Sequence, residues 1–202
     1  MDHLPESLRS LVDQLARARL PGLGPKSALR LVMTLLKWPE SETRSLGRSI
    51  YELRDRLCLC ARCGALSDTD PCSICSDPAR QETMLCVVAE WDSMLTLENG
   101  NFFKGQYFIL GGLLSPLNSM AENLELERLF ARLSENRVEE IVLALGSTLE
   151  AENTATFVRN QIRNRFPQVQ VSRLAQGIPL GAEVKFMDRE TLRQSLQYRQ
   201  QF

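Results

Sequence analysis

The sequence has little histidine, little net charge and no long apolar run. Its only histidine is His3, so a Ser-His-Asp triad or a zinc site built on histidine is unsupported. No apolar run reaches the roughly 20 residues needed to cross a bilayer, and no secretory signal is recognisable. We therefore expect a cytoplasmic protein that has no membrane partner and whose thiols stay reduced.

The formal net charge of -1 conceals an uneven distribution. Residues 1–57 carry 10 Lys and Arg against 7 Asp and Glu, whereas residues 81–172 carry 7 against 12. The N-terminal part is therefore the better contact for an anionic polymer. An excess of three positive charges is modest, so one subunit should bind nucleic acid weakly and in a salt-dependent way. Oligomerisation would strengthen such binding.

Cysteine, in contrast, is concentrated in one short segment. Cys60, Cys63, Cys72 and Cys75 form two CxxC pairs separated by eight residues. Two such turns facing each other supply the four thiolates of a tetrahedral zinc site. A redox CxxC and a pair of disulfides are the alternatives, which a reducing cytosol disfavours. Cys58 is a fifth thiol that we interpret as a spare. A closed shell of four thiolates leaves no position for water, so we expect one structural Zn²⁺.

Before the cysteines, the pattern predicts three helices. Apolar residues recur at helical spacing over 6–19, 27–37 and 41–57. The first two helices are separated by LPGLGP, in which Gly22 and Gly24 can both adopt positive φ and turn their N–H groups toward a phosphate. Lys26 and Arg30 follow on one face of the next helix. This pattern is typical of a helix-hairpin-helix that grips the nucleic-acid backbone without reading bases. An ordinary αα-turn and a P-loop are the alternatives, and the glycine spacing disfavours the P-loop.

After Pro78, short apolar runs alternate with amphipathic stretches. Strands are predicted at 84–89, 107–110, 141–145 and 169–171, and helices near 122–135 and 151–166. Alternation of this kind indicates βαβ units around a parallel sheet. A further short strand at 183–187 and a last helix from about Arg189 complete the prediction.

In this order, the motifs resemble the RecR family of bacterial recombination mediators. The resemblance runs nearly end to end and rests on LPGLGPKSALRL at 20–31, the two CxxC turns with SDPARQE, CVVAE at 86–90, YFILGGLLSPL at 107–117, EAENTA at 150–155 and RLAQGIPLGAE at 173–183. It implies a Toprim domain and a ring-like homotetramer that clamps DNA in the nucleoid. It also implies that the protein acts with RecO and RecF in DNA repair and recombination, promoting RecA loading on SSB-coated single strands.

Catalytic Toprim domains hold magnesium on a glutamate after the first strand and an acidic pair after a later one. By this resemblance the candidates here are Glu90, Glu150 and Glu152. The alternative is that these glutamates are solvated helix-start residues that complement the helix dipole. We expect no enzymatic activity, because the acidic pair departs from the catalytic aspartates and no activated tyrosine is evident. A Mg-dependent nuclease or strand-transfer enzyme and a protein-only scaffold stay open as alternatives.

The predicted fold is thus mixed α and β, in four parts. Residues 1–57 form a helix-hairpin-helix domain and residues 58–79 a four-cysteine zinc finger. Residues 80–172 form the Toprim domain with a mainly parallel sheet, and residues 173–202 a tail of one strand and one helix.

Overall fold

The computed structural model describes residues 4–18, 20–115 and 124–199, so that His3 lies outside the described residues. The chain divides into two compact units, residues 1–56 and residues 57–202. Each unit has its own apolar core.

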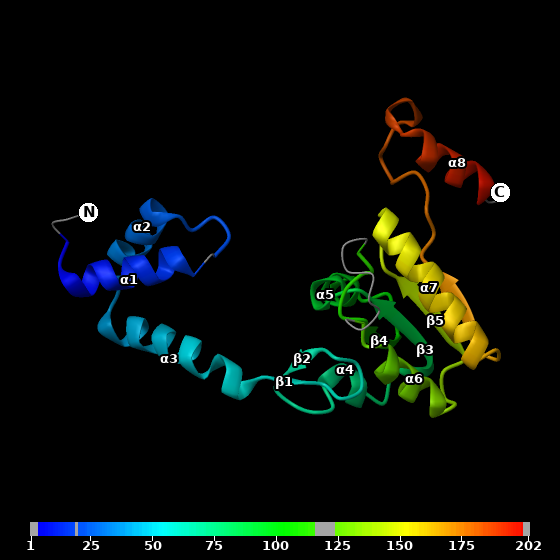
Figure 1. Cartoon of the computed structure of the whole chain (residues 1–202), viewed down its shortest axis with the longest axis horizontal. Helices are drawn as coiled ribbons and strands as arrows, with labels where there is room; N and C mark the ends of the chain where they lie inside the picture. Colours follow the sequence, from blue (N-terminus) through cyan, green and yellow to red (C-terminus); the bar gives the residue numbers. More distant parts are fainter. Residues whose placement is uncertain (1–3, 19, 116–123, 200–202) are drawn as a thin grey trace. The chain divides into compact units, whose positions relative to one another are not determined.

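The N-terminal unit consists of helices α1 (Glu6–Arg17), α2 (Pro25–Leu35) and α3 (Glu40–Arg56) (Figure 1). Helices α1 and α2 pack together through Val12, Ala28 and Val32, none of which is more than 2% exposed. Pro25 occupies the first turn of α2, where its fixed φ favours the helix and its missing N–H costs nothing. The predicted pair of amphipathic helices around LPGLGP is therefore present.

Helix α3 also forms as predicted, but its apolar face is open within the single chain. Leu46, Ile50 and Leu53 are 38%, 67% and 55% exposed, and no residue of α3 is buried. Acidic residues in its first turn and basic residues in its last turn complement the helix dipole. The helix therefore draws its stability from local interactions more than from packing.

The second unit begins with the cysteine segment and continues into a four-stranded sheet. A short antiparallel pair, β1 (Cys58–Leu59) and β2 (Leu66–Ser67), precedes the one-turn helix α4 (Ser73–Ser76). The sheet has the order β4-β3-β5-β6, and every pairing in it is parallel. Its strands are β3 (Gln81–Val88), β4 (Gly105–Ile109), β5 (Glu140–Ala144) and β6 (Gln170–Arg173). The predicted parallel sheet is confirmed.

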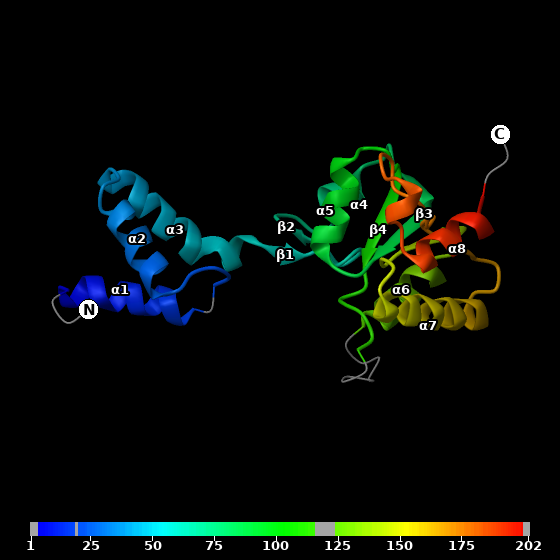
Figure 2. The same cartoon turned by 90° about the horizontal axis from the view of Figure 1, so that it is seen from above.

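Helices cover both faces of this sheet, as parallel strands require (Figure 2). Leu85 and Val87 of β3 face a core with α6 (Leu126–Ser134) and α7 (Leu149–Arg165). Cys86 and Val88 face the opposite side. There they share a core with Met94 of α5 (Trp91–Asn99) and with the four cysteines of the two CxxC motifs. The cysteine segment is therefore part of one face of the sheet domain.

The tail differs from the prediction. Residues 183–187 do not form a strand: Val184–Phe186 is a 3₁₀ helix, η2, and α8 (Arg189–Gln197) follows it. The Phe186 N–H donates to Glu183 O and the Met187 N–H to Val184 O, so these donors are used locally instead of in a ladder. The predicted strand at 183–187 was therefore wrong, and none of the described strands pairs with this segment.

Two helices of the sheet domain also differ from the prediction. Helix α5 was not predicted. The predicted helix near 122–135 begins at Leu126, and residues 122 and 123 lie outside the described part.

Candidate functional site

The four cysteines of the two CxxC pairs converge on one point. Their Sγ atoms all lie within 4.8 Å of one another, and all four side chains are buried. The Cys63 and Cys72 sulfurs are 3.6 Å apart. Four sulfurs at about 2.3 Å from a central Zn²⁺ would be separated by about 3.8 Å, so the cluster has the size of a tetrahedral zinc shell.

Two local turns build the cluster. Cys60 and Cys63 lie on a tight turn closed by Gly64 N–H donating to Cys60 O at 2.8 Å, and Gly64 has φ of +81°. Cys72 caps α4, whose Cys75 N–H points at the Cys72 sulfur at 3.5 Å. The N–H of Cys72 and the N–H of Ala65 likewise point at the sulfurs of Cys60 and Cys63, each at 3.4 Å. Such N–H groups favour thiolates, the form that binds metal.

The pKa values of these thiols reflect their crowding. Burial raises the pKa of Cys60, but hydrogen bonds from the backbone of Cys72, Cys63 and Arg62 outweigh it and lower the value to about 7. The pKa of Cys63 is raised by its hydrogen bond with the Cys75 thiol and by burial. Burial raises the pKa of Cys72 to about 11. Four adjacent thiolates therefore require a cation among them, and a divalent soft metal meets that requirement.

Cys58 lies outside the cluster. Its thiol is half-buried and donates to Ser67 O at 3.2 Å, across the β1–β2 pair. Within the described residues, the four-cysteine cluster is the only group of three or more His, Cys, Asp or Glu side chains close enough to share an ion.

The hairpin between α1 and α2 has one of its two glycines at positive φ. Gly22 has φ of +73°, while Gly24 is extended with φ of -83° and ψ of 176°. Gly24 acts as the N-cap of α2, and because it has no side chain it gives the helix no side-chain cap. The sequence permits positive φ at both glycines, and the structure adopts it at Gly22 and not at Gly24. The first turn of α2 is open, which suits an anion at its N-terminus.

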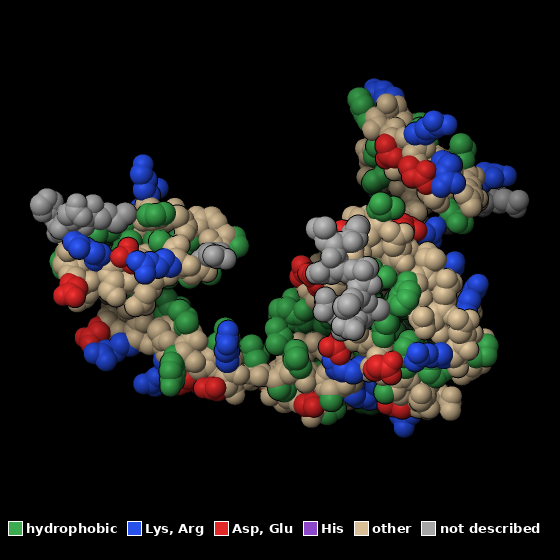
Figure 3. Space-filling view, in the orientation of Figure 1, with side chains coloured by type: hydrophobic (Ala, Val, Ile, Leu, Met, Phe, Trp, Pro, Cys, Tyr) green, Lys and Arg blue, Asp and Glu red, His purple; other side chains and the backbone are tan. Residues whose placement is uncertain are grey.

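Lys26 and Arg30 lie one turn apart on α2, and both side chains are exposed. Neither is in an ion pair with another residue of the described part of the chain. Lys and Arg side chains project from the surface of this unit (Figure 3). The hairpin therefore offers backbone donors and two uncommitted cations.

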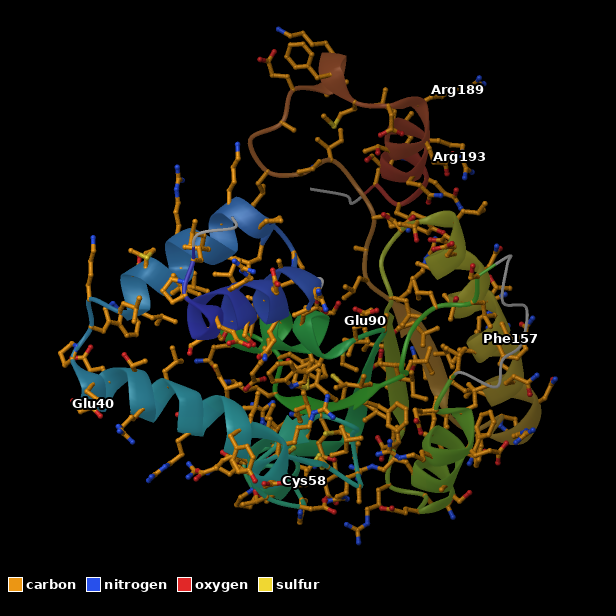
Figure 4. All side chains as sticks on the ribbon, turned by 60° about the vertical axis from the view of Figure 1, so that its left-hand side comes forward. Glu40, Cys58, Glu90, Phe157, Arg189 and Arg193 are labelled. Atoms are coloured by element: carbon orange, nitrogen blue, oxygen red, sulfur yellow. The ribbon has the colours of Figure 1, made fainter. Side chains whose placement is uncertain are left out.

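The three candidate glutamates follow neighbouring parallel strands. Glu90 comes after β3, at the N-cap of α5 (Figure 4), and Glu150 and Glu152 lie in the first turn of α7, after β5. Glu90 and Glu150 are exposed. Glu152 is already engaged: it accepts from Arg173 at 2.8 and 3.1 Å and from Gln176 at 2.7 Å. The structure does not gather the three carboxylates into a ligand group, and magnesium binding stays a prediction.

Family models match the chain almost throughout. They are the RecR helix-hairpin-helix at residues 8–53, the RecR four-cysteine zinc finger at 57–77, the Toprim domain at 83–175 and the RecR C-terminal region at 177–200. A recombination protein RecR from Nitratidesulfovibrio vulgaris is 68% identical over 201 residues, which are 99% of both chains. The chain belongs to the RecR family. Recombination proteins RecR from Maridesulfovibrio salexigens and Moorella thermoacetica are 50% and 39% identical over 99% and 94% of both chains.

Membership of the RecR family places the chain in DNA recombination and repair, and the zinc-finger match supports a structural zinc in the cysteine cluster. No helix in the described ranges is long and apolar enough to span a membrane.

Four polar residues that the sequence does not single out contact Glu152 or the cysteine turns. Arg173 and Gln176 bind Glu152, and they line a cavity of about 730 Å³ beside α8. Arg62 and Arg128 contact the cysteine turns. Arg62 lies inside the first CxxC motif and could have been suspected. Arg173 and Gln176 lie in the motif at 173–183, but nothing in that motif links them to Glu152, and no local pattern indicates Arg128.

Replacing Gly22 with alanine should destabilise the N-terminal unit by about 1–2 kcal/mol, because φ of +73° is unfavourable for a residue with a Cβ. Gly47→Ala is the matched control: a Cβ at this helical position of α3 meets nothing within 4 Å, so the change should stabilise by about 0.5–1 kcal/mol. Urea unfolding followed by Trp38 fluorescence, in a Trp91→Phe background, measures both. Equal stability of the Gly22→Ala variant and its parent would contradict the hairpin geometry.

Proposed function

We propose that the chain is a DNA-binding mediator of recombination and repair that works as a non-enzymatic clamp and adaptor. The observation that carries this proposal is the exposed pair Lys26 and Arg30 beside the open first turn of α2. Gly22 and Gly24 let the backbone approach a phosphate, and the two cations contact neighbouring phosphates. Contacts of this kind position a protein on DNA without base specificity.

The other parts of the chain have supporting roles in this proposal. Residues 1–57 hold DNA, and residues 58–79 bind one structural Zn²⁺ through Cys60, Cys63, Cys72 and Cys75. Residues 80–172 recruit partner proteins, and residues 173–202 extend that domain. Following the resemblance to the RecR family, the partners are RecO and RecF, and the outcome is loading of RecA on single-stranded DNA coated by SSB. Such a protein works in the cytoplasm and joins the nucleoid when bound to DNA.

A homotetrameric ring or clamp is part of this proposal, because one hairpin supplies too few cations for firm binding. Each cation that neutralises a phosphate contributes a slope of about -0.9 in log K against log salt, so a single pair gives a weak and salt-dependent complex. Several hairpins on one ring would act together through a high effective concentration. The open apolar face of α3, with Leu46, Ile50 and Leu53, supports contact with another copy.

Solution mass and DNA retention test the clamp together. We expect the zinc-loaded protein to have the mass of four chains by light scattering. We also expect it to stay longer on closed circular DNA than on a linear fragment of the same length, because a ring leaves linear DNA by sliding off its ends. A monomer that leaves both DNAs at the same rate would contradict the clamp. A tetramer that binds neither DNA at low salt would indicate a protein-only scaffold.

The Toprim match favours a second candidate, a Mg-dependent nuclease or strand-transfer enzyme that uses Glu90, Glu150 and Glu152. We expect no cleavage, because Glu152 is held by Arg173 and Gln176, and Mg²⁺ would have to displace both. Incubation with supercoiled plasmid and Mg²⁺ should leave the plasmid intact for the wild type and for Glu90→Gln alike. Nicking by the wild type that disappears in Glu90→Gln would establish the enzyme instead.

A further inference from the structure

The first cysteine turn is bonded to the sheet domain through its backbone. The Ile109 N–H of β4 donates to Cys63 O at 2.8 Å. Arg128 of α6 donates through Nη2 to Cys60 O at 3.0 Å and to Ala61 O at 3.1 Å. Three carbonyls of one CxxC turn are therefore held by a strand and a helix that lie 46 or more residues further along the chain.

Arg128 is fixed by contacts on both sides of its guanidinium. Its Nη1 donates to Glu125 Oε2 at 3.3 Å, and the side chain is 34% exposed. The next residue, Leu129, is fully buried in the main core, so the helix that carries Arg128 cannot shift freely. Nη2 donates to both carbonyls while Nη1 reaches Glu125, and a planar guanidinium holds these two nitrogens in a fixed fork that an ammonium lacks.

Gly64 shows how closely the turn approaches its support. With φ of +81°, a Cβ at this position would lie 3.5 Å from Arg128 Nη1 and 3.6 Å from Ile109 Cβ. The same turn directs the Cys60 and Cys63 sulfurs into the cluster and the Cys60, Ala61 and Cys63 carbonyls toward α6 and β4. Whatever fixes the sulfurs therefore also fixes the carbonyls.

We propose that Arg128 is a positioning residue that couples metal occupancy of the four-cysteine cluster to the order of β4 and α6. Metal binding fixes the first CxxC turn, which holds the acceptors of Arg128 and of the Ile109 N–H in place. By thermodynamic linkage the effect is reciprocal, so that intact contacts at Arg128 strengthen the hold of the cluster on its metal. The proposal rests on zinc in the cluster and is independent of DNA binding.

Zinc release and hydrogen exchange of the full chain test the coupling. Arg128→Ala should still bind one zinc per chain but lose it to a chelating dye about tenfold faster, as expected when hydrogen bonds from a charged donor are lost. Amide exchange should rise in β4 and α6 and stay unchanged in α7, which makes neither contact. Arg193→Ala is the matched control, because Arg193 is an exposed arginine of the same unit that pairs with Glu190 of its own helix, α8. It should release zinc at the wild-type rate.

Arg128→Lys keeps the charge but loses the second nitrogen that contacts Glu125 and orients the guanidinium, so it should release zinc at an intermediate rate. If Arg128→Ala does not fold, the zinc-release rate of Arg128→Lys is compared with that of Arg193→Lys, and a faster release by Arg128→Lys supports the coupling. Wild-type release rates and wild-type exchange in β4 for both Arg128 variants would overturn the proposal. A zinc content below one per chain in the wild type would refute occupancy itself, and mass spectrometry of the native protein measures that separately.

Discussion

Cys63→Ser is expected to abolish zinc binding and to unfold the cysteine segment together with the sheet face on which it packs. The Cys63 side chain is 1% exposed and shares a core with Cys86, Val88 and Tyr107 of the sheet. A structural zinc contributes on the order of 10–16 kcal/mol in zinc-finger peptides, which is comparable to the whole stability of a domain, about 5–15 kcal/mol. Loss of the metal therefore exceeds what the remaining packing can offset.

Cys58→Ser is the matched control for this change. Cys58 is two residues from Cys60 but lies outside the cluster, so this variant should keep one zinc per chain and melt within a few degrees of the wild type. Zinc content by mass spectrometry and thermal unfolding by circular dichroism distinguish the two variants. A Cys63→Ser protein with full zinc and an unchanged melting temperature would refute the metal site. Loss of zinc in Cys58→Ser would instead show that the ligand register is wrong.

Replacing both Lys26 and Arg30 with alanine should weaken DNA binding about 100-fold at moderate salt. In the proposed complex each cation donates a charge-assisted hydrogen bond to a phosphate, and two such bonds at about 1.5 kcal/mol each correspond to about two decades of affinity. The loss of affinity should be the same for unrelated DNA sequences, since the proposed contacts are with the phosphate backbone of the DNA and not with the bases. Both side chains are exposed, so the fold should be retained. Fluorescence anisotropy with several labelled oligonucleotides measures the affinities.

The control for the double variant is Arg163→Ala with Arg189→Ala. Both arginines are exposed, and they lie in the second unit, on α7 and α8. This pair removes the same total charge from residues outside the hairpin. It should change affinity by less than about threefold, because salt screens exposed charges that do not contact a phosphate. An equal loss in both double variants would show that net charge, and not the hairpin, governs binding.

Elements with a strong local signal could be predicted from the sequence. The CxxC spacing predicts the cluster. The helical spacing of apolar residues over 6–19, among them Leu8, Val12 and Leu15, and over 27–37 predicts α1 and α2. The apolar runs of β3, β4 and β5 are largely buried on both faces and were therefore recognisable as parallel strands. Each of these signals lies within a short stretch of sequence.

The features that the sequence did not predict are contacts between residues distant in the sequence and local backbone conformations. Arg128 is 68 residues from Cys60, and Arg173 is 21 residues from Glu152. Neither contact therefore produces a recognisable periodicity in the sequence. Residues 183–187 have a strand-like composition, but two of their N–H groups donate to carbonyls three residues earlier, and no described strand pairs with them. Gly24 could have adopted positive φ, yet as the N-cap before Pro25 it takes the extended conformation typical of that position.

The salt dependence of DNA binding tests the central claim, that Lys26 and Arg30 grip phosphates, most directly. Affinities measured between low and moderate salt give a line of log K against log salt. For the Lys26→Ala and Arg30→Ala double variant, with zinc content and solution mass equal to the wild type, the slope should be shallower by about 1.8 for each bound hairpin. An unchanged slope and unchanged affinity in that variant would contradict the account.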